Sequence, residues 1–160
     1  MENTVFFKLI ILVVFKITFS VSGDNFFPNK IISSLSKELN IIDFFNPTDE
    51  TGKEKGNKFE YGSMSFMHPK IFGYLGDGLE YEDEFINFFE INLSLFQKNE
   101  VDDFVFFIEV YYSRQQCNFE IFNNSMLFKL TKGSGKISIP VSVYHLEKKE
   151  IKDLLLFKSK

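Results

Sequence analysis

The chain has 160 residues, a formal net charge of −4 at pH 7 and a charged fraction of 25%, which are the values of one ordinary globular domain. Its composition is unusual in one respect, because it holds 22 Phe and no Trp. No evident basic segment is present, and nucleic-acid binding requires a basic footprint. Composition and charge therefore exclude nucleic acid as an expected partner.

The first 22 residues have the layout of a secretory signal peptide. Residues Leu9–Phe15 form an uninterrupted apolar run between Lys8 and Lys16, and the small residues of Ser20–Gly23 follow. The run is too short for a membrane span, which needs about 20 apolar residues. We expect a signal peptide over residues 1–22, cleaved after Ser22, and a protein secreted or held in the secretory lumen. The alternative is an uncleaved anchor.

Residues 23–57 are expected to connect the signal peptide to the main domain. After an extended entry, apolar residues recur three or four positions apart at Ile31, Leu35, Leu39 and Ile42. This spacing predicts an amphipathic helix over residues 29–45 that covers one face of a sheet. The polar residues 46–57 contain Pro and Gly, and they predict a linker.

Residues 58–160 are expected to form an all-β, mainly antiparallel β-sandwich of six to seven strands. Its central strand is predicted at Phe104–Tyr112, which is apolar on both faces and therefore suits the middle of a sheet. Alternating apolar residues place other strands at 59–67, 70–75, 85–96, 118–122, 126–130 and 137–143. Pro140 cannot donate to a ladder, which indicates an edge strand. The tail 147–160 is either a short helix or a final strand.

An acidic loop is the candidate metal site. It holds Asp77, Glu80, Glu82, Asp83 and Glu84 in eight residues, and Asp102 and Asp103 follow later in the chain. Carboxylates are calcium ligands, so calcium bound by Asp77, Glu80, Asp83, Asp102 and Asp103 is one hypothesis. The spacing does not match an EF-hand, and the competing interpretation is a solvated acidic surface.

The strands, the acidic loop and the Ile-Pro-containing late strand together resemble C2-type sandwiches in architecture. That resemblance implies calcium-dependent binding of a membrane or lipid through the acidic loop 77–84. The chain carries no motif specific to that family.

Catalytic signatures are absent from the sequence. Cys117, His68 and His145 are the residues from which a Cys–His pair would be built, but no local signature surrounds the cysteine. We therefore expect no enzyme. Cys117 has no partner cysteine in the chain, so it is predicted to be a free thiol that pairs with another chain or lies buried as a small apolar residue.

Two N-glycosylation triplets agree with the predicted secretory address. They begin at Asn92 and Asn123. Asn92 is expected on the polar, solvent-facing side of the strand at 85–96, and Asn123 in a hairpin turn.

These observations favour a secreted, non-enzymatic β-sandwich that acts as a protein-binding or structural module. Its partner is expected to be another protein, and no cofactor is required. The alternative function is the calcium-dependent membrane or lipid binder of the C2 type, in which calcium is the cofactor.

Overall fold

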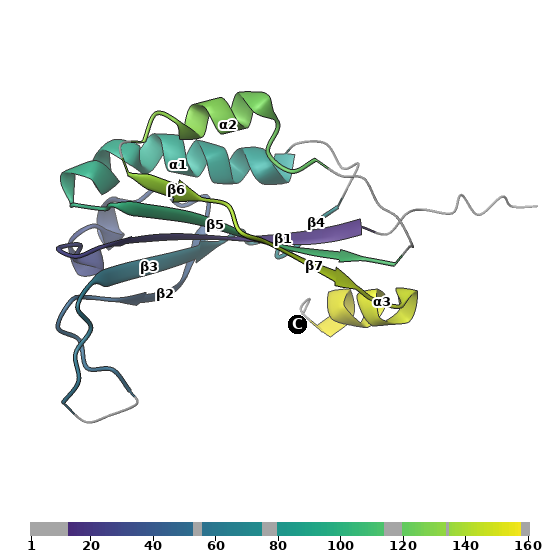
Figure 1. Cartoon of the computed structure of the whole chain (residues 1–160), viewed down its shortest axis with the longest axis horizontal. Coiled ribbons are helices and arrows are strands. Elements are labelled where there is room, and N and C mark those ends of the chain that lie inside the picture. Colours follow the sequence, from purple (N-terminus) through teal and green to yellow (C-terminus); the bar gives the residue numbers. More distant parts are fainter. Residues whose placement is uncertain (1–12, 53–55, 75–79, 114–119, 134, 158–160) are drawn as a thin grey trace, which may run out of the picture.

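The computed structural model describes residues 13–52, 56–74, 80–113, 120–133 and 135–157 (Figure 1). The two longest strands are β1 (Val13–Gly23) and β5 (Asp103–Tyr112). The shorter strands are β2 (Asn40–Phe45), β3 (Gly62–Met67), β4 (Gly73–Tyr74), β6 (Lys136–Ser138) and β7 (Val141–His145). The helices are α1 (Glu80–Lys98), α2 (Asn124–Leu130) and α3 (Lys148–Phe157), and single 3-10 turns lie at Pro28–Lys30 and Ile32–Ser34.

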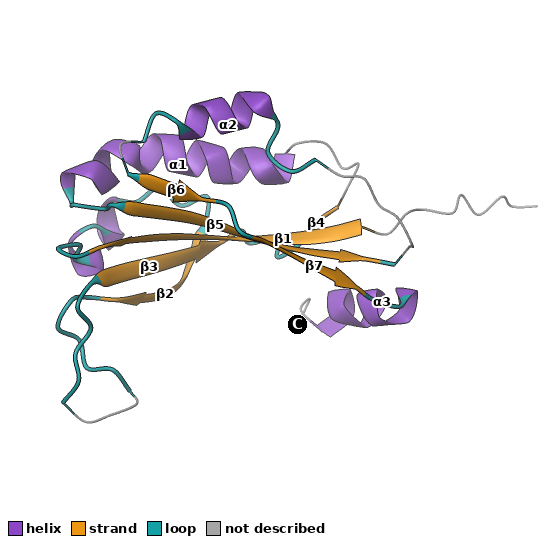
Figure 2. Ribbon diagram, viewed as in Figure 1, coloured by secondary structure: helices purple, strands orange, loops and turns teal. Residues whose placement is uncertain are grey.

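All seven strands belong to one open, mixed sheet (Figure 2). The strand order is β2-β3-β1-β5-β6, with β4 also paired to β1 and β7 also paired to β5. The pairs made by β1 are antiparallel, whereas β5 binds both β6 and β7 in parallel. The β1–β5 ladder pairs Val13 with Tyr112 and continues to Ser22 with Asp103. These two strands are therefore the centre of the sheet.

Alternation along β1 explains why it lies at the centre. Its residues Phe15, Ile17, Phe19 and Val21 are buried on one face of the sheet, where α1 and α2 pack (Figure 1). The residues between them are polar and half-buried on the opposite face. Successive side chains of a strand point to opposite faces, so one strand supplies both an apolar core and a polar surface.

Phe19 is the hub of the aromatic core. Its ring lies 4.4 Å from that of Phe106 in a stacked arrangement, and it contacts further rings from β3, β5 and α1. These rings belong to Phe66, Phe88, Phe89, Phe96 and Phe104, with centroids 5.7–6.5 Å away. Such aromatic pairs contribute about 0.5–1.5 kcal/mol each beyond the area that they bury.

A second, smaller apolar cluster lies on the other face of the sheet, at one end. There α3 places Ile151 against Val14 of β1 and Phe72. The rest of this face is half-exposed in the described part of the chain. The sheet therefore has one helix-covered face and one face that α3 covers only in part (Figure 1).

The predicted strand at 85–96 is wrong, because these residues belong to helix α1. The sequence pattern was ambiguous between periods of 2 and 3.6. The buried residues Phe85, Phe88, Phe89 and Phe96 have helical spacing, whereas Ile91, which the strand pattern placed with the apolar face, is 61% exposed. Packing against β1 and β5 selects the helical set.

The predicted helix at 29–45 is also wrong. Its second half is strand β2, which pairs antiparallel with β3, and its first half holds only the two 3-10 turns. The segment Asn40–Phe45 is rich in β-branched and aromatic residues, which favour a pleated strand. Leu35 and Leu39 are buried as predicted, but they reach the core from irregular chain.

The predicted central strand is confirmed as β5, and the late strand is confirmed as β6 and β7, which Pro140 separates. The tail is the helix α3. The hairpin predicted around Asn123 is wrong, because the Asn123 side chain caps α2 by accepting a hydrogen bond from Met126 N at 3.0 Å. A β-sandwich is not confirmed, since the described strands form one mixed sheet rather than two antiparallel ones.

Cleavage after Ser22 is incompatible with this sheet. It would remove every residue of β1 except Gly23, and with them the partner of both β3 and β5. Entry into the secretory pathway with this fold therefore requires that Val13–Gly23 be retained.

The first prediction concerns Phe19. Phe19→Ala should lower the free energy of unfolding by about 3–5 kcal/mol, because it leaves a cavity among six rings. The measurement is urea denaturation followed by circular dichroism. Phe128→Ala, which truncates a ring that is 70% exposed, should cost less than about 0.5 kcal/mol. Equal losses in the two variants would contradict the assignment of the core.

The second prediction concerns the N-terminal strand. A chain that begins at Gly23 should show no cooperative thermal transition, because β3 and β5 then lose their shared neighbour. The full chain, produced in secreting cells, should retain β1 when its intact mass is measured. A mass that places the N-terminus at Gly23, together with a cooperative melt, would refute this sheet.

Candidate functional site

The carboxylates predicted to bind calcium are not brought together. Asp83 lies in the first turn of α1, whereas Asp102 and Asp103 follow the end of that helix. With a rise of 1.5 Å per residue, the intervening helix separates them by more than about 20 Å. Asp77 and the Glu80 side chain lie outside the described part of the chain. Among the described residues, no group of three potential metal ligands is present.

The two histidines lie on different strands of the sheet. His68 follows β3, and its Nε2 contacts the Glu84 carboxylate of α1. His145 ends β7, three strand spacings away, which is at least about 14 Å. Cys117 lies outside the described residues, so its predicted free thiol and any approach to a histidine remain predictions.

The two predicted glycan acceptors have opposite surroundings. Asn92 is 2% exposed, and its Nδ2 donates to Phe88 O and Ser36 Oγ at 2.8 and 2.7 Å. The prediction that Asn92 faces solvent is wrong, and in this conformation its Nδ2 has no room for a sugar. Asn123 is half-buried at the start of α2, and its glycosylation remains a prediction.

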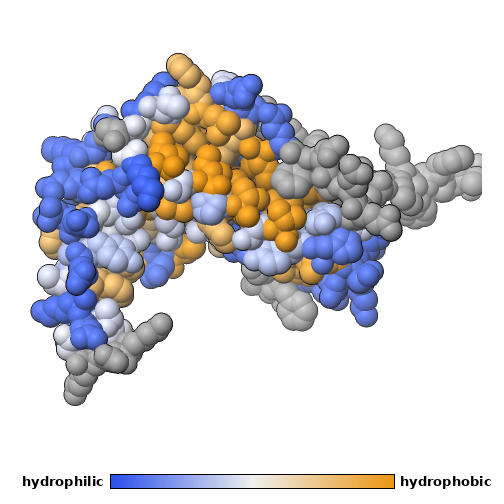
Figure 3. Space-filling view, in the orientation of Figure 1, coloured by the Kyte–Doolittle hydropathy of each residue, from blue (hydrophilic) through white to orange (hydrophobic). Residues whose placement is uncertain are grey.

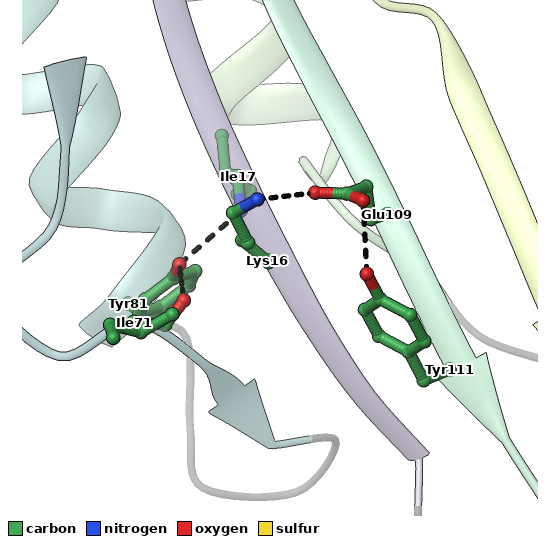
Figure 4. Close-up of polar contacts among 6 residues, drawn as sticks. All are labelled: Lys16, Ile17, Ile71, Tyr81, Glu109 and Tyr111. Carbon is green, nitrogen blue, oxygen red and sulfur yellow. Dashed lines mark hydrogen bonds and ion pairs between the residues drawn. The ribbon is translucent and has the colours of Figure 1, made fainter. Parts of the chain in front are cut away.

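A polar network crosses the centre of the partly covered face (Figure 4). Lys16 Nζ lies 2.6 Å from Glu109 Oε2, and Tyr111 Oη donates to Glu109 Oε1 at 2.9 Å. Burial and the adjacent Glu109 carboxylate raise the pKa of Tyr111, so this hydroxyl remains a hydrogen-bond donor at neutral pH. A paired ammonium and a protonated phenol offer no free base, and we interpret this network as a cross-strand tie.

An apolar surface lies at the β7 edge of the sheet, on the face that the helices cover. Val141 and Val143 are 50% and 52% exposed, and they continue a row that begins with the half-buried Ile137 and Ile139. Leu127 and Phe128 are also exposed, and they belong to α2, which lies on the same face of the sheet (Figure 1). Figure 3 shows the apolar band that runs from α2 across β6 toward β7. We call these six residues the β7-edge surface.

The backbone along the same edge is unpaired on its outer side in the described part of the chain. Ile108 N donates to Pro140 O, and Leu146 N donates to Tyr112 O, both at 2.9 Å. Because backbone groups alternate in direction, those of residues 140, 142, 144 and 146 point toward β5. Those of Val141, Val143 and His145 point away from it. Exposed apolar side chains and free backbone groups therefore occur on the same residues.

The sequence predicted only part of this surface. The alternation of residues 137–143 indicated a strand, and Pro140 indicated an edge. The exposure of Val141 and Val143 depends on where helices α1 and α2 end over the sheet. Because the residues of both helices were predicted as strands, the sequence could not predict this exposure.

Comparison with known proteins gives no relative: no family model, no curated protein and no solved structure matches the chain. Among the described residues, no helix is both long enough and apolar enough to cross a membrane.

Glu82 belongs to the acidic loop for which calcium binding and a solvated surface were the two expectations, and its carboxylate is buried. It is 4% exposed, and its Oε2 has no hydrogen-bond partner among the residues that the structure describes. Burial raises the pKa of Glu82 above its ordinary value of 4.5, and the neighbouring Asp83 adds to this effect. A carboxylate with a raised pKa in the folded state destabilises the fold at neutral pH.

The third prediction follows from the sign of this shift. The folded protein binds the Glu82 proton more tightly than the unfolded chain, so this group's penalty is present above its folded pKa and disappears as the pH falls through that value toward 4.5. Glu82→Gln should therefore raise the free energy of unfolding at pH 7 by on the order of 1 kcal/mol. The gain should shrink at lower pH.

Urea denaturation of both proteins between pH 4.5 and 8 measures this difference. Glu38→Gln alters an exposed carboxylate and should leave stability unchanged within about 0.5 kcal/mol. A Glu82→Gln variant that is less stable than the parent at pH 7 would show that the carboxylate is stabilising.

Proposed function

We propose that the chain is a non-enzymatic protein-binding module whose partner adds an extended segment to the β7 edge of the sheet. The observation that carries the proposal is the coincidence, on Val141 and Val143, of exposed apolar side chains and outward-pointing backbone groups. Strand addition uses both features, because the backbone gives affinity and alternate side chains give specificity.

The length of the edge suits this mode of binding. Strand β7 has five residues and spans about 17 Å, so it offers outward backbone groups at three alternate positions. The incoming segment would place every second side chain on the helix-covered face, beside the exposed Val141 and Val143. Its chemistry is therefore an extended stretch with apolar residues at alternate positions.

The opposite edge of the sheet is less suited to strand addition. Strand β2 carries a register shift between Ile41 and Asp43, and it places the charged Asp43 in the middle of the edge. Bulges and charges are the devices with which natural proteins protect an edge from pairing. The described part of β7 has neither.

The secretory address and the absence of enzymatic activity belong to the same proposal. The secretory address rests on the apolar run at Leu9–Phe15 and requires that β1 is retained. The absence of enzymatic activity rests on the lack of a catalytic signature in the sequence. The C2-like alternative loses support, because Asp83 lies far from Asp102 and Asp103, and because the described strands form one sheet.

The fourth prediction tests strand addition with peptides selected from a displayed random library against the full chain. Bound peptide should slow amide exchange at Val141, Val143 and His145, whose N–H groups point outward. Exchange at Ser142 and Tyr144 should change little, because their N–H groups already point toward β5. Hydrogen exchange resolved to single amides is the measurement.

Two substitutions at one position provide the matched control. Val143→Pro removes an outward N–H and should weaken peptide binding by about tenfold, which corresponds to 1.4 kcal/mol. Val143→Thr keeps the N–H and the side-chain shape, and its affinity should stay within about threefold. Peptides that slow exchange elsewhere, or a wild-type chain that dimerises through this edge, would refute the proposed partner.

A further inference from the structure

A hollow lies between the irregular segment 31–39 and strands β2 and β3. Its volume is about 880 Å³, which is within the usual range for small-molecule sites. The apolar part of its lining consists of Ile32, Leu35, Leu39, Ile41 and Phe66. It lies at the β2 side of the sheet, away from the β7-edge surface.

One wall of the hollow carries three hydrogen-bond donors. They belong to Ser33, Ser36 and Lys37, which line the hollow together with the polar Asn40, and none of these three side chains donates to an acceptor within the described part of the chain. Ser36 Oγ accepts a hydrogen bond from Asn92, so its own proton is free to donate. The neighbouring Glu38 lines a different hollow along α1. Lys37 is therefore the charged residue among the described lining residues, beside five apolar ones.

A buried amide fixes this wall to the helix layer. Asn92 of α1 accepts from Ser36 N at 3.1 Å and donates to Ser36 Oγ at 2.7 Å. Its Nδ2 also donates to Phe88 O, which holds the side chain in place. Ser36 is thus held by a hydrogen-bonded core residue, although segment 31–39 has no regular α-helix or strand of its own.

We propose that this hollow binds an amphipathic carboxylic acid, with the alkyl chain along the half-buried Ile32 and Ile41 and the carboxylate at Lys37. Charge complementarity favours a carboxylate head group, because an anion accepts hydrogen bonds from an ammonium and from hydroxyls. The apolar lining selects a hydrocarbon tail. This site is separate from the protein-binding edge and does not depend on it.

The fifth prediction uses decanoate as the probe, at concentrations below those at which it forms micelles. Calorimetric titration into the full chain should show saturable binding of one decanoate per chain, and decanol should bind at least tenfold more weakly. Lys37→Gln should weaken decanoate binding at least fivefold and should leave decanol binding unchanged. Lys30→Gln alters a lysine that lies over the Phe27 ring, outside the hollow, and should keep the parent affinity within twofold.

A bulky side chain at the mouth of the hollow is the second variant. Ser33→Trp changes an exposed residue, so it should leave the thermal melt unchanged and should abolish binding of both ligands. The absence of saturable decanoate binding would overturn the proposal. Equal affinities for decanoate and decanol, or equal losses in the Lys37 and Lys30 variants, would overturn it as well.

Discussion

The ladder between β1 and β5 is the constraint on which the rest of the fold depends. These two strands pair along almost their whole length, and every other described strand except β2 pairs with one of them. Phe19 of β1 and Phe106 of β5 are register partners, and their rings stack at 4.4 Å. Helix α1 then packs its own rings onto this pair from one side. The two proposed binding sites lie at opposite edges of the sheet that this ladder joins.

The two faces of the ladder have different chemistry. On the helix-covered face the side chains are almost all apolar, and they bury without any need for polar partners. On the other face Lys16 and Glu109 meet as cross-strand partners, and Ser20 and Ser65 share a hydrogen bond at 2.8 Å. Such polar pairs fix the register of a sheet, because a shift by one residue would bury them among the Phe rings.

The sequence predicted the strands better than the helices, for a physical reason. Strand β5 has β-branched and aromatic residues at nearly every position, so no other element suits it. The sequence of helix α1 is ambiguous, because the polar Asn92 is buried and the apolar Ile91 is exposed. The buried Asn92 amide is hydrogen-bonded to Ser36 and Phe88. Only the position of segment 31–39 makes a buried asparagine favourable, and that position is not encoded locally. The exposed β7 edge and the hollow beside Lys37 likewise arise from the packing of segments that are distant in the chain, so no local sequence motif predicts them.

The separation along the chain between β1 and β5 also affects how the protein folds during its synthesis on the ribosome. Lys16 and Glu109, which meet in the ladder, are 93 positions apart. At elongation rates of 5–20 residues per second, β1 leaves the ribosome roughly 5 to 20 s before its partner exists. During that interval its apolar face is shielded only by early partners such as β3, whose Phe66 pairs with Phe19. The apolar face of β1 is therefore exposed on the nascent chain until β5 has been synthesised. We expect chaperones that bind nascent chains to bind this strand.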